Sequence, residues 1–347
     1  QSVEAVKTIM RFCFENRIPV TPQGGNTGLC GAAVPSGGVL LNLSRLNRIR
    51  NISTADNAIT VEAGCVLHDV QQAAEGAGRF FPLSLASEGS CQIGGNIACN
   101  AGGLNVLRYG TMRDLVMGLE VVLPNGELVS HLHPLHKDTT GYDLRQLFVG
   151  SEGTLGIITA ATLKLFALPK SRETAWVGVN GIGQAVELLT LIRERFAERL
   201  CSFELISRFA LQLSSEYSGI APPTDAPWHI LLELTDSLSR GDLADLLGRE
   251  LHAPADSFYA ALTNPELLSL YGKTPETAVC LFLPNTYEVY WTLSPAALLA
   301  RMNRESKAFW TPERLAKAQA DSLSPDQVIT VASIVKRLIA YSIFSGA

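Results

Sequence analysis

The sequence lacks the patterns that mark several common classes of protein. Its seven cysteines are scattered and form no CxxC pair, which argues against a zinc site and favours reduced thiols over a disulfide framework. No apolar run reaches the roughly 18 residues of a membrane-spanning helix, since the run at 328–335 ends at Lys336. Lysine and arginine form no cluster and the formal net charge is -5, so nucleic acid is not an expected partner.

The N-terminal residues also lack the basic and apolar regions of a signal peptide. Together with the reduced thiols, this predicts a cytoplasmic protein. In their place is an amphipathic pattern that predicts a helix over residues 1–16, with apolar residues at Val3, Val6, Ile9, Met10 and Cys13. A chain that opens within a helix is expected to have lost residues that came before it.

What the sequence does contain fits a protein of about two domains, with 347 residues of which 47% are hydrophobic and 18% charged. Up to about residue 166, short β-branched runs alternate with glycine-rich turns and a helical stretch at 67–77. The runs predict strands at 39–43, 58–62, 116–123 and 156–166. We therefore expect an α+β domain over residues 1–170, closed by a boundary at 168–170.

Two regions of different texture follow this domain. Residues 171–251 are expected to form a partial α/β domain, with strands at 175–179 and 229–234 and helices at 184–197 and 207–215. Residues 252–347 contain short helices, each opened by a hydroxyl residue and a proline, a pair suited to the N-cap and first position of a helix. These pairs begin at Thr274, Ser294, Thr311 and Ser324. The third region is therefore predicted to be small and mainly helical.

A dense glycine turn, QGGNTGL at residues 23–29, follows a short apolar stretch. Glycine can adopt positive φ and lets backbone N–H groups converge on an anion, so such a loop suits a pyrophosphate. For this loop alone, a tight connection between two elements is an equally good explanation. It is neither a Walker loop, which needs Gly-Lys-Ser/Thr, nor a Rossmann GxGxxG.

Two further glycine segments change this balance. SEGSCQIGGNIACNAGG at 87–103 is followed by RYG at 108–110, and GSEGTLGIIT spans 150–159. Many small residues on one segment allow a large flat ligand to approach the backbone closely. Three such segments in one domain are hard to explain as turns alone.

The segment from residue 18 to 169 resembles the FAD-binding domain of PCMH-type flavoproteins in the vanillyl-alcohol-oxidase superfamily. It is most similar to their D-lactate, glycolate and D-2-hydroxyglutarate dehydrogenase branch. The motifs that carry the resemblance are PQGGNTGL, VEAG, SLASEGSCQIGGNIACNAGG, RYG, DLVMGLEVVLPNG and GYDLRQLFVGSEGTLGIIT. The resemblance implies FAD as cofactor and an oxidoreductase that converts a 2-hydroxy acid to the 2-oxo acid with hydride transfer to FAD. It leaves the electron acceptor open.

The resemblance also assigns cofactor-binding residues. The first loop would wrap the FAD pyrophosphate, through Gly24, Gly25, Asn26, Thr27, Gly28 and Leu29. The second segment would approach the isoalloxazine and ribityl chain, through Ser87, Gly94, Gly95, Asn96, Ala98, Asn100 and Gly103. Gly153 and Ile158 would lie near the adenine side. No catalytic residue is assigned.

Residues 171 to about 250 resemble the start of the same family's cap domain, through FELISRFALQL at 203–213. The family's remaining half, with its basic substrate-binding residues and histidine-containing metal site, has no counterpart in the sequence. The resemblance therefore implies a cofactor site without a substrate site.

The tail at 257–335 instead resembles the YceG-like endolytic murein transglycosylases, through LFLPNTYEVYW, FWTPERLAKAQ and LSPDQVITVASIV. In that family ASIV precedes a glutamate-containing stretch that supplies the general acid, whereas here Lys336, Arg337, Leu338 and Ile339 follow. We expect no transglycosylase activity, and two partial families joined near residue 251 suggest a chimera. Three hypotheses remain open: a flavoprotein dehydrogenase, a cell-wall glycan-cleaving or glycan-binding protein, and a folded remnant that binds nothing.

Other side chains with possible chemistry are expected to be structural. His131, His133 and His136 alternate around a proline, which favours a solvent loop over a metal site. Structural hydrogen bonds are the expected role of Glu152 and Asp143. Burial as small hydrophobic residues is expected for Cys30 and Cys99.

Overall fold

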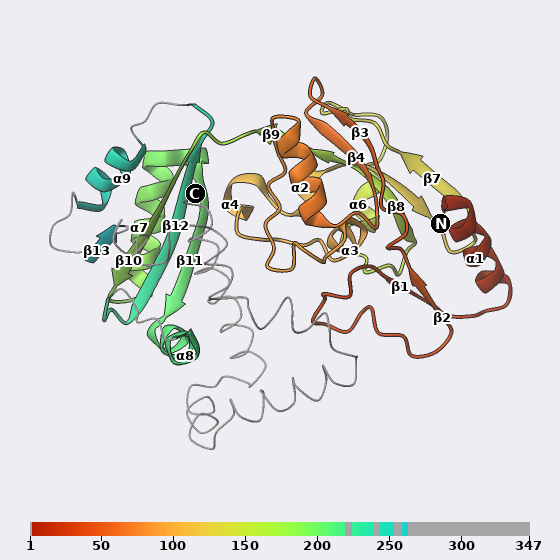
Figure 1. The fold of residues 1–347 in the computed structure, drawn as a ribbon, viewed down its shortest axis with the longest axis horizontal. Helices are drawn as coiled ribbons and strands as arrows, with labels where there is room; N and C mark the ends of the chain where they lie inside the picture. The colour runs from red at the N-terminus through yellow and green to blue at the C-terminus, as the bar shows by residue number, and fades with distance from the viewer. Residues whose placement is uncertain (1, 219–223, 239–242, 253–258, 263–347) are drawn as a thin grey trace, which may run out of the picture. The chain divides into compact units, whose positions relative to one another are not determined.

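The computed structural model describes residues 2–218, 224–238, 243–252 and 259–262 (Figure 1). These residues fall into two compact units. Unit 1 contains the residues up to Lys170 and the short segment that starts at Asp236. Unit 2 starts at Ser171, runs to Thr235 and includes the described residues beyond position 240.

Unit 1 is organised around an antiparallel five-stranded sheet of order β3-β4-β8-β6-β7. The strands are β3 (Ile49–Ser53), β4 (Ala58–Glu62), β6 (Val116–Val122), β7 (Leu128–His131) and β8 (Ile157–Lys164). Every residue of β6 is buried, as are all but the last of β8. Strands buried on both faces read as continuous apolar runs, which is how they are visible in the sequence.

Two longer helices pack in unit 1, and both are amphipathic. α1 (Val3–Glu15) begins at Ser2, whose Oγ accepts a hydrogen bond from the Ala5 N–H at 3.3 Å. It buries Val6, Met10 and Cys13, and α2 (Leu67–Gly76) buries Leu67, Val70 and Ala74. The apolar spacing of three and four residues therefore sets which side of each helix is inward.

Short elements complete unit 1. β1 (Val20–Gln23) pairs in parallel with β2 (Val39–Asn42), and β5 (Arg79–Phe80) pairs antiparallel with β9 (Phe166–Ala167). The short helices are α3 (Ile93–Ala98), α4 (Val106–Tyr109), α5 (Met112–Leu115) and α6 (Arg145–Phe148).

Unit 2 is a sheet covered by helices. Its strand order is β11-β12-β10-β13, formed by β10 (Ser171–Val179), β11 (Leu200–Ser207), β12 (Trp228–Asp236) and β13 (Tyr259–Leu262). Its helices are α7 (Ile182–Phe196), the 3₁₀ turn η1 (Ala197–Arg199), α8 (Arg208–Ser218) and α9 (Leu243–His252). Aliphatic residues of α7 and α9 form one buried cluster with β10, β11 and β12, and Figure 1 shows α7 lying along this sheet.

The prediction of an α+β fold is confirmed. β4 coincides with the predicted strand at 58–62, and α1 and α2 lie within a residue or two of the predicted helices. In unit 2 the predicted strands and helices are present, but β11 was not foreseen. The short helices predicted from Thr274 onward lie outside the described residues.

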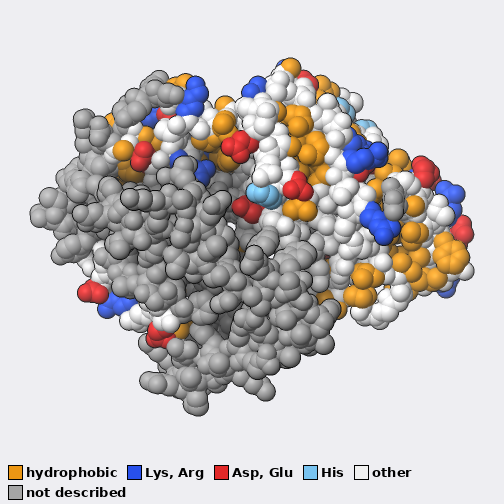
Figure 2. Space-filling model, in the orientation of Figure 1, with side chains coloured by type: hydrophobic (Ala, Val, Ile, Leu, Met, Phe, Trp, Pro, Cys, Tyr) orange, Lys and Arg blue, Asp and Glu red, His pale blue; other side chains and the backbone are white. Residues whose placement is uncertain are grey.

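Among the described helices, none is long and apolar enough to cross a membrane. On the face drawn in Figure 2, the basic side chains stand apart, with acidic ones among them. Among the described side chains on that face, positive charge is therefore not gathered in a patch for a phosphate backbone.

Candidate functional site

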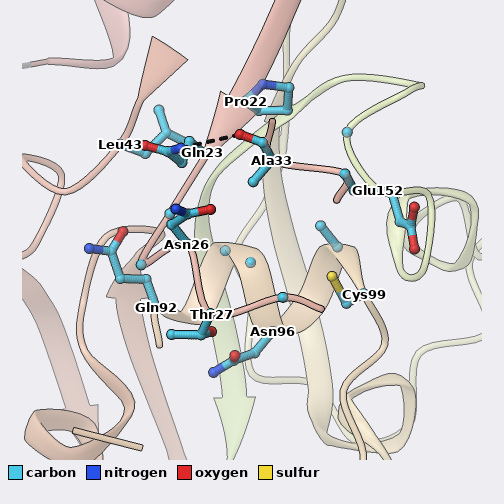
Figure 3. A pocket seen from close by; sticks show the side chains of 18 of the residues that line it. Pro22, Gln23, Asn26, Thr27, Ala33, Leu43, Gln92, Asn96, Cys99 and Glu152 are labelled. Carbon is cyan, nitrogen blue, oxygen red and sulfur yellow. Dashed lines mark hydrogen bonds between the residues drawn. The ribbon is translucent and has the colours of Figure 1, made fainter. Parts of the chain in front are cut away.

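The first glycine loop leaves the end of β1 and is held in place by close backbone packing. The Gln23 side chain closes the loop on itself by donating from Nε2 to the Ala33 carbonyl at 3.2 Å (Figure 3). A Cβ at Gly25 would overlap the carbonyl oxygen of Ser90 in the second segment. Glycine is therefore needed at position 25 so that two loops distant in sequence can touch.

The same loop presents free hydrogen-bond donors. Within the described part of the chain, the backbone N–H groups of residues 25–29 donate to no protein acceptor. Asn26 has a φ of 52°, a left-handed conformation that asparagine tolerates better than most residues. At Gly28, the position that a Cβ would take has no atom of the described residues within 4 Å. Free N–H groups in a glycine turn suit an anion such as a pyrophosphate.

The second segment contributes α3 and the turn before it. Gly94 lies against Ala63, the residue that follows β4, since a Cβ there would come within 2.7 Å of the Ala63 Cβ. At Gly95, the next residue of the same helix, a Cβ would have no atom of the described residues within 4 Å. One glycine thus lets the helix approach the sheet, and the other leaves open space on the pocket wall.

The third segment enters β8 beside the first loop. Gly153 has a φ of 79°, and a Cβ there would overlap the ring of Pro22 in β1. Ile157 and Ile158 then begin β8 and are buried. The turn that precedes β8 is therefore packed directly against the strand that carries the first loop.

These three segments enclose a pocket of about 450 Å³, within the range of small-molecule sites. Thirteen of the fifteen residues assigned to the cofactor line it: Gly24, Gly25, Asn26, Thr27, Gly28, Leu29, Ser87, Gly94, Gly95, Asn96, Ala98, Gly153 and Ile158. We call this cavity the glycine pocket. The folding of unit 1 therefore brings all three sequence segments to one place.

The remaining two residues, Asn100 and Gly103, are not part of the pocket wall. Asn100 has a φ of 46°, and its Oδ1 accepts a hydrogen bond from the Arg113 N–H at 2.9 Å. A Cβ at Gly103 would overlap the Ser84 carbonyl oxygen. Both residues hold the second segment in shape, which explains their place in the motif without a contact to the pocket.

Several wall residues were not assigned from the sequence. Gln92 is 8% exposed, and its Oε1 has no hydrogen-bond partner in the described structure. Pro22, Gln23, Ala63 and Gly156 also line the pocket. Each lies within one of the quoted motifs, but no feature of the residue itself marked it as part of a pocket wall.

Two of the expected structural roles are wrong. Cys30 and Cys99 are exposed rather than buried and both line the glycine pocket, because Cys30 directly follows the first glycine segment and Cys99 caps the end of α3, so neither lies inside an element. Glu152 has a φ of 51°, and its side chain has no hydrogen-bond partner among the described residues. Of the described residues that line the pocket, it alone is charged, and Figure 3 shows it beside Cys99.

The other candidates lie away from this pocket. Asp143 accepts hydrogen bonds from Arg145 at 2.7 Å and Gln146 at 3.3 Å, which is the structural role expected of it. His131 and His133 line a separate cavity of about 310 Å³ next to β6 and β7. Among the described residues, no group of three or more histidine, cysteine or carboxylate side chains is placed to hold a metal ion.

Two family models match this chain. The model of a family described as an FAD binding domain matches residues 1–131, and the model of the YceG-like family matches residues 205–338. The second match begins well before the junction that the sequence suggested near residue 251.

Similar full-length proteins point to one enzyme class. The chain is 39% identical over 259 residues to a mitochondrial D-2-hydroxyglutarate dehydrogenase of Bos taurus, covering 74% of this chain and 47% of that protein. It is 40% identical over 244 residues to the Danio rerio enzyme of the same name, covering 70% and 46%. The chain spans about half the length of the curated relatives it matches. The expectation of a cytoplasmic location is wrong, because these relatives are named as mitochondrial enzymes.

Among solved structures, p-cresol methylhydroxylase with substrate bound is similar in fold. The TM-score is 0.62 at 19% sequence identity, covering 80% of this chain and 59% of that one. At this identity the likeness concerns the fold alone.

Proposed function

We propose that the glycine pocket of unit 1 is where this chain holds FAD, in an oxidoreductase of the D-2-hydroxy acid dehydrogenase type, because residues 1–131 match the model of an FAD binding domain. The observation that carries the proposal is the pocket itself. Three glycine segments line one cavity of about 450 Å³, with free backbone donors on one wall and open space at Gly28 and Gly95.

The residues present fit the cofactor. Among the described residues of the wall there is no lysine or arginine, so the pyrophosphate would be held by the N–H groups of residues 25–29. Gly95 and Ala98 on α3 offer a wall without bulky side chains to a flat ring. The buried Oε1 of Gln92 would accept a hydrogen bond from a donor on the cofactor, which would satisfy an otherwise unpaired group.

The protein's part in the reaction is to bind and orient. FAD, when bound, supplies the redox chemistry that amino-acid side chains cannot perform. The packing of Gly25 on Ser90 and of Gly153 on Pro22 fixes the pocket walls relative to each other before any ligand binds. A preformed wall lowers the ordering cost of binding.

Equilibrium titration with FAD tests this assignment. We expect the folded chain to bind one FAD per chain, with a shift of the flavin visible spectrum. Gly28→Val should abolish binding, because its side chain would fill the open space now found at position 28. If Gly28→Val is folded by circular dichroism and still takes up stoichiometric FAD, the assignment of the first loop is wrong.

The substrate class is a 2-hydroxy acid, such as D-lactate, glycolate or D-2-hydroxyglutarate. We propose that this chain handles such acids poorly, because residues 205–338 match the YceG-like family model instead of continuing the dehydrogenase pattern. A misplacement of about 1 Å can cost roughly a hundredfold in rate. Bound flavin should be reduced by dithionite but hardly by D-2-hydroxy acids. Saturable anaerobic bleaching by a D-2-hydroxy acid, with preference over the L-enantiomer, would contradict this.

The YceG-like match favours a second candidate, a lytic transglycosylase of the cell wall. We propose that the chain does not cleave peptidoglycan, since Lys336 to Ile339 follow ASIV where the family has its glutamate-containing stretch. Glu288 and Glu305 are carboxylates of the same tail. If the chain released glycan fragments in a digestion assay, and mutation of either glutamate abolished that release, the proposal would be overturned.

A further inference from the structure

Two cysteines stand on the wall of the glycine pocket, and the binding of FAD does not require either of them. Cys30 follows the first loop, and Cys99 is the C-cap residue of α3. Both are exposed, whereas the other described cysteines, Cys13, Cys65, Cys91 and Cys201, are buried. A reagent that reaches the pocket therefore meets two thiols that come from different sequence segments.

The surroundings of Cys99 place these groups near one another. Partial desolvation raises the pKa of the Cys99 thiol even though the residue is exposed, and the Glu152 carboxylate and the Cys30 thiol raise it further. Cys99 and Glu152 lie on the same side of the pocket in Figure 3, opposite Asn26. The pair thus belongs to one cavity and one electrostatic environment.

We propose that Cys30 and Cys99 form a thiol modification site for low-molecular-weight disulfides, and that S-thiolation at this site and FAD binding exclude each other. This inference rests on the proposed function, because it assumes that FAD occupies the glycine pocket. An added thiol group would take up part of the roughly 450 Å³ that the cofactor needs.

The chemistry is thiol–disulfide exchange. A cysteine thiolate attacks one sulfur of the disulfide, forms a mixed disulfide, and releases the other half as a thiolate that takes up a proton. The raised pKa of Cys99 lowers its thiolate fraction, so we assign the first attack to Cys30 and the slower one to Cys99. Cofactor in the pocket should shield both thiols.

The test treats the FAD-free chain with 5,5′-dithiobis(2-nitrobenzoate) and maps the labelled peptides by mass spectrometry. Cys30 and Cys99 should react at least about tenfold faster than the four buried cysteines. The Kd for FAD should rise by at least about tenfold after labelling, return on reduction with dithiothreitol, and FAD added first should slow labelling of both thiols.

Each variant is compared with itself, before and after the reagent. Cys30→Ser/Cys99→Ser should show the same Kd in both states, whatever its own affinity. Cys201→Ser can keep its hydrogen bond to Thr235 and should respond like the natural chain. Unchanged FAD binding by the labelled natural chain would overturn the thiol inference alone, whereas failure of the untreated chain to bind FAD would overturn the proposed function as well.

Discussion

Units 1 and 2 are both sheets with helices, but they use their small and large residues differently. In unit 1, glycines bring backbone onto backbone at Gly25 and leave open space at Gly28 and Gly95. In unit 2, Leu188, Ile192, Ile230 and Leu232 are fully buried against one another. The open positions Gly28 and Gly95 and the buried side chains of unit 2 are separate residues, so substitutions at the first should affect binding and substitutions at the second stability.

Among the substitutions proposed here, the largest loss of stability is expected from one in unit 2. Leu232→Ala removes a fully buried side chain from β12 and should lower the free energy of unfolding by about 2–5 kcal/mol, the usual cost of such a cavity. Leu205→Ala on β11, where the side chain is exposed, is the matched control and should cost far less. Urea unfolding gives both values. If the folded Leu232→Ala chain bound FAD more weakly, this would contradict the view that this side chain contributes to stability and not to binding.

A smaller loss is expected where two loops of unit 1 touch. Gly25→Ala places a Cβ onto the Ser90 carbonyl and should cost about 1–3 kcal/mol, as overpacking does. Gly28→Ala, three residues along the same loop, meets no atom of the described residues and should leave the unfolding free energy of the FAD-free chain nearly unchanged. If the two substitutions lowered the unfolding free energy equally, this would contradict the close packing of Gly25 on Ser90.

Gly95→Ala should change the stability of the chain and its affinity for FAD in opposite directions. Alanine in α3 should raise the stability of the FAD-free chain by up to about 1 kcal/mol, because glycine is a poor helix former. It should nevertheless weaken FAD binding, since the new methyl group enters the pocket. Gly183→Ala in α7, which also meets open space, should stabilise its helix without changing the Kd. Unaltered FAD affinity in Gly95→Ala would remove α3 from the cofactor site.

The smallest effects should appear in the pH dependence of two buried glutamates. Burial acts to raise the pKa of Glu62, but hydrogen bonds from Arg48 and Arg50 outweigh it and lower the pKa. Burial raises the pKa of Glu233 in unit 2, and Arg172 at 3.6 Å offsets this only in part. The same residue type therefore favours opposite protonation states in the two units.

These directions fix the sign of the pH response. Glu62 contributes stability above its unfolded pKa that is lost as pH falls through its folded pKa, so Glu62→Gln should destabilise at pH 7 and less so below about pH 4. The folded state favours the protonated form of Glu233, so the stability that this side chain contributes is lost as pH rises through its raised pKa. Glu233→Gln should thus gain stability relative to the natural chain as pH increases. Parallel pH profiles for the two variants would contradict the assignment.

The sequence predicted those parts of the fold that have a simple period. β4 and α2 show clear patterns and were located closely, but β11 was missed because Ser202 and Glu204 interrupt its apolar residues. In the structure these polar side chains sit opposite Glu233 and Leu231 in β12, a pairing that only the sheet reveals. Burial of a polar strand face depends on neighbours distant in sequence.

The site was predictable to a similar extent. The three glycine motifs contain most of the pocket wall, because close backbone contacts require glycine. Gln92 and Cys99 lie inside the second motif and Cys30 directly follows the first, but their place on the wall was not assigned because it depends on how the segments fold together. Asn100 and Gly103 show the reverse, since their motif residues serve the fold instead of the pocket.

The measurement that tests the central claim most directly is FAD titration of the natural chain beside Gly95→Ala and Gly183→Ala, with unfolding measured on the same samples. We expect one FAD per natural chain, unchanged affinity in Gly183→Ala, and weaker binding in Gly95→Ala although that variant is at least as stable. Absence of FAD binding by the folded natural chain, or equal affinity in all three, would contradict the glycine pocket as the cofactor site.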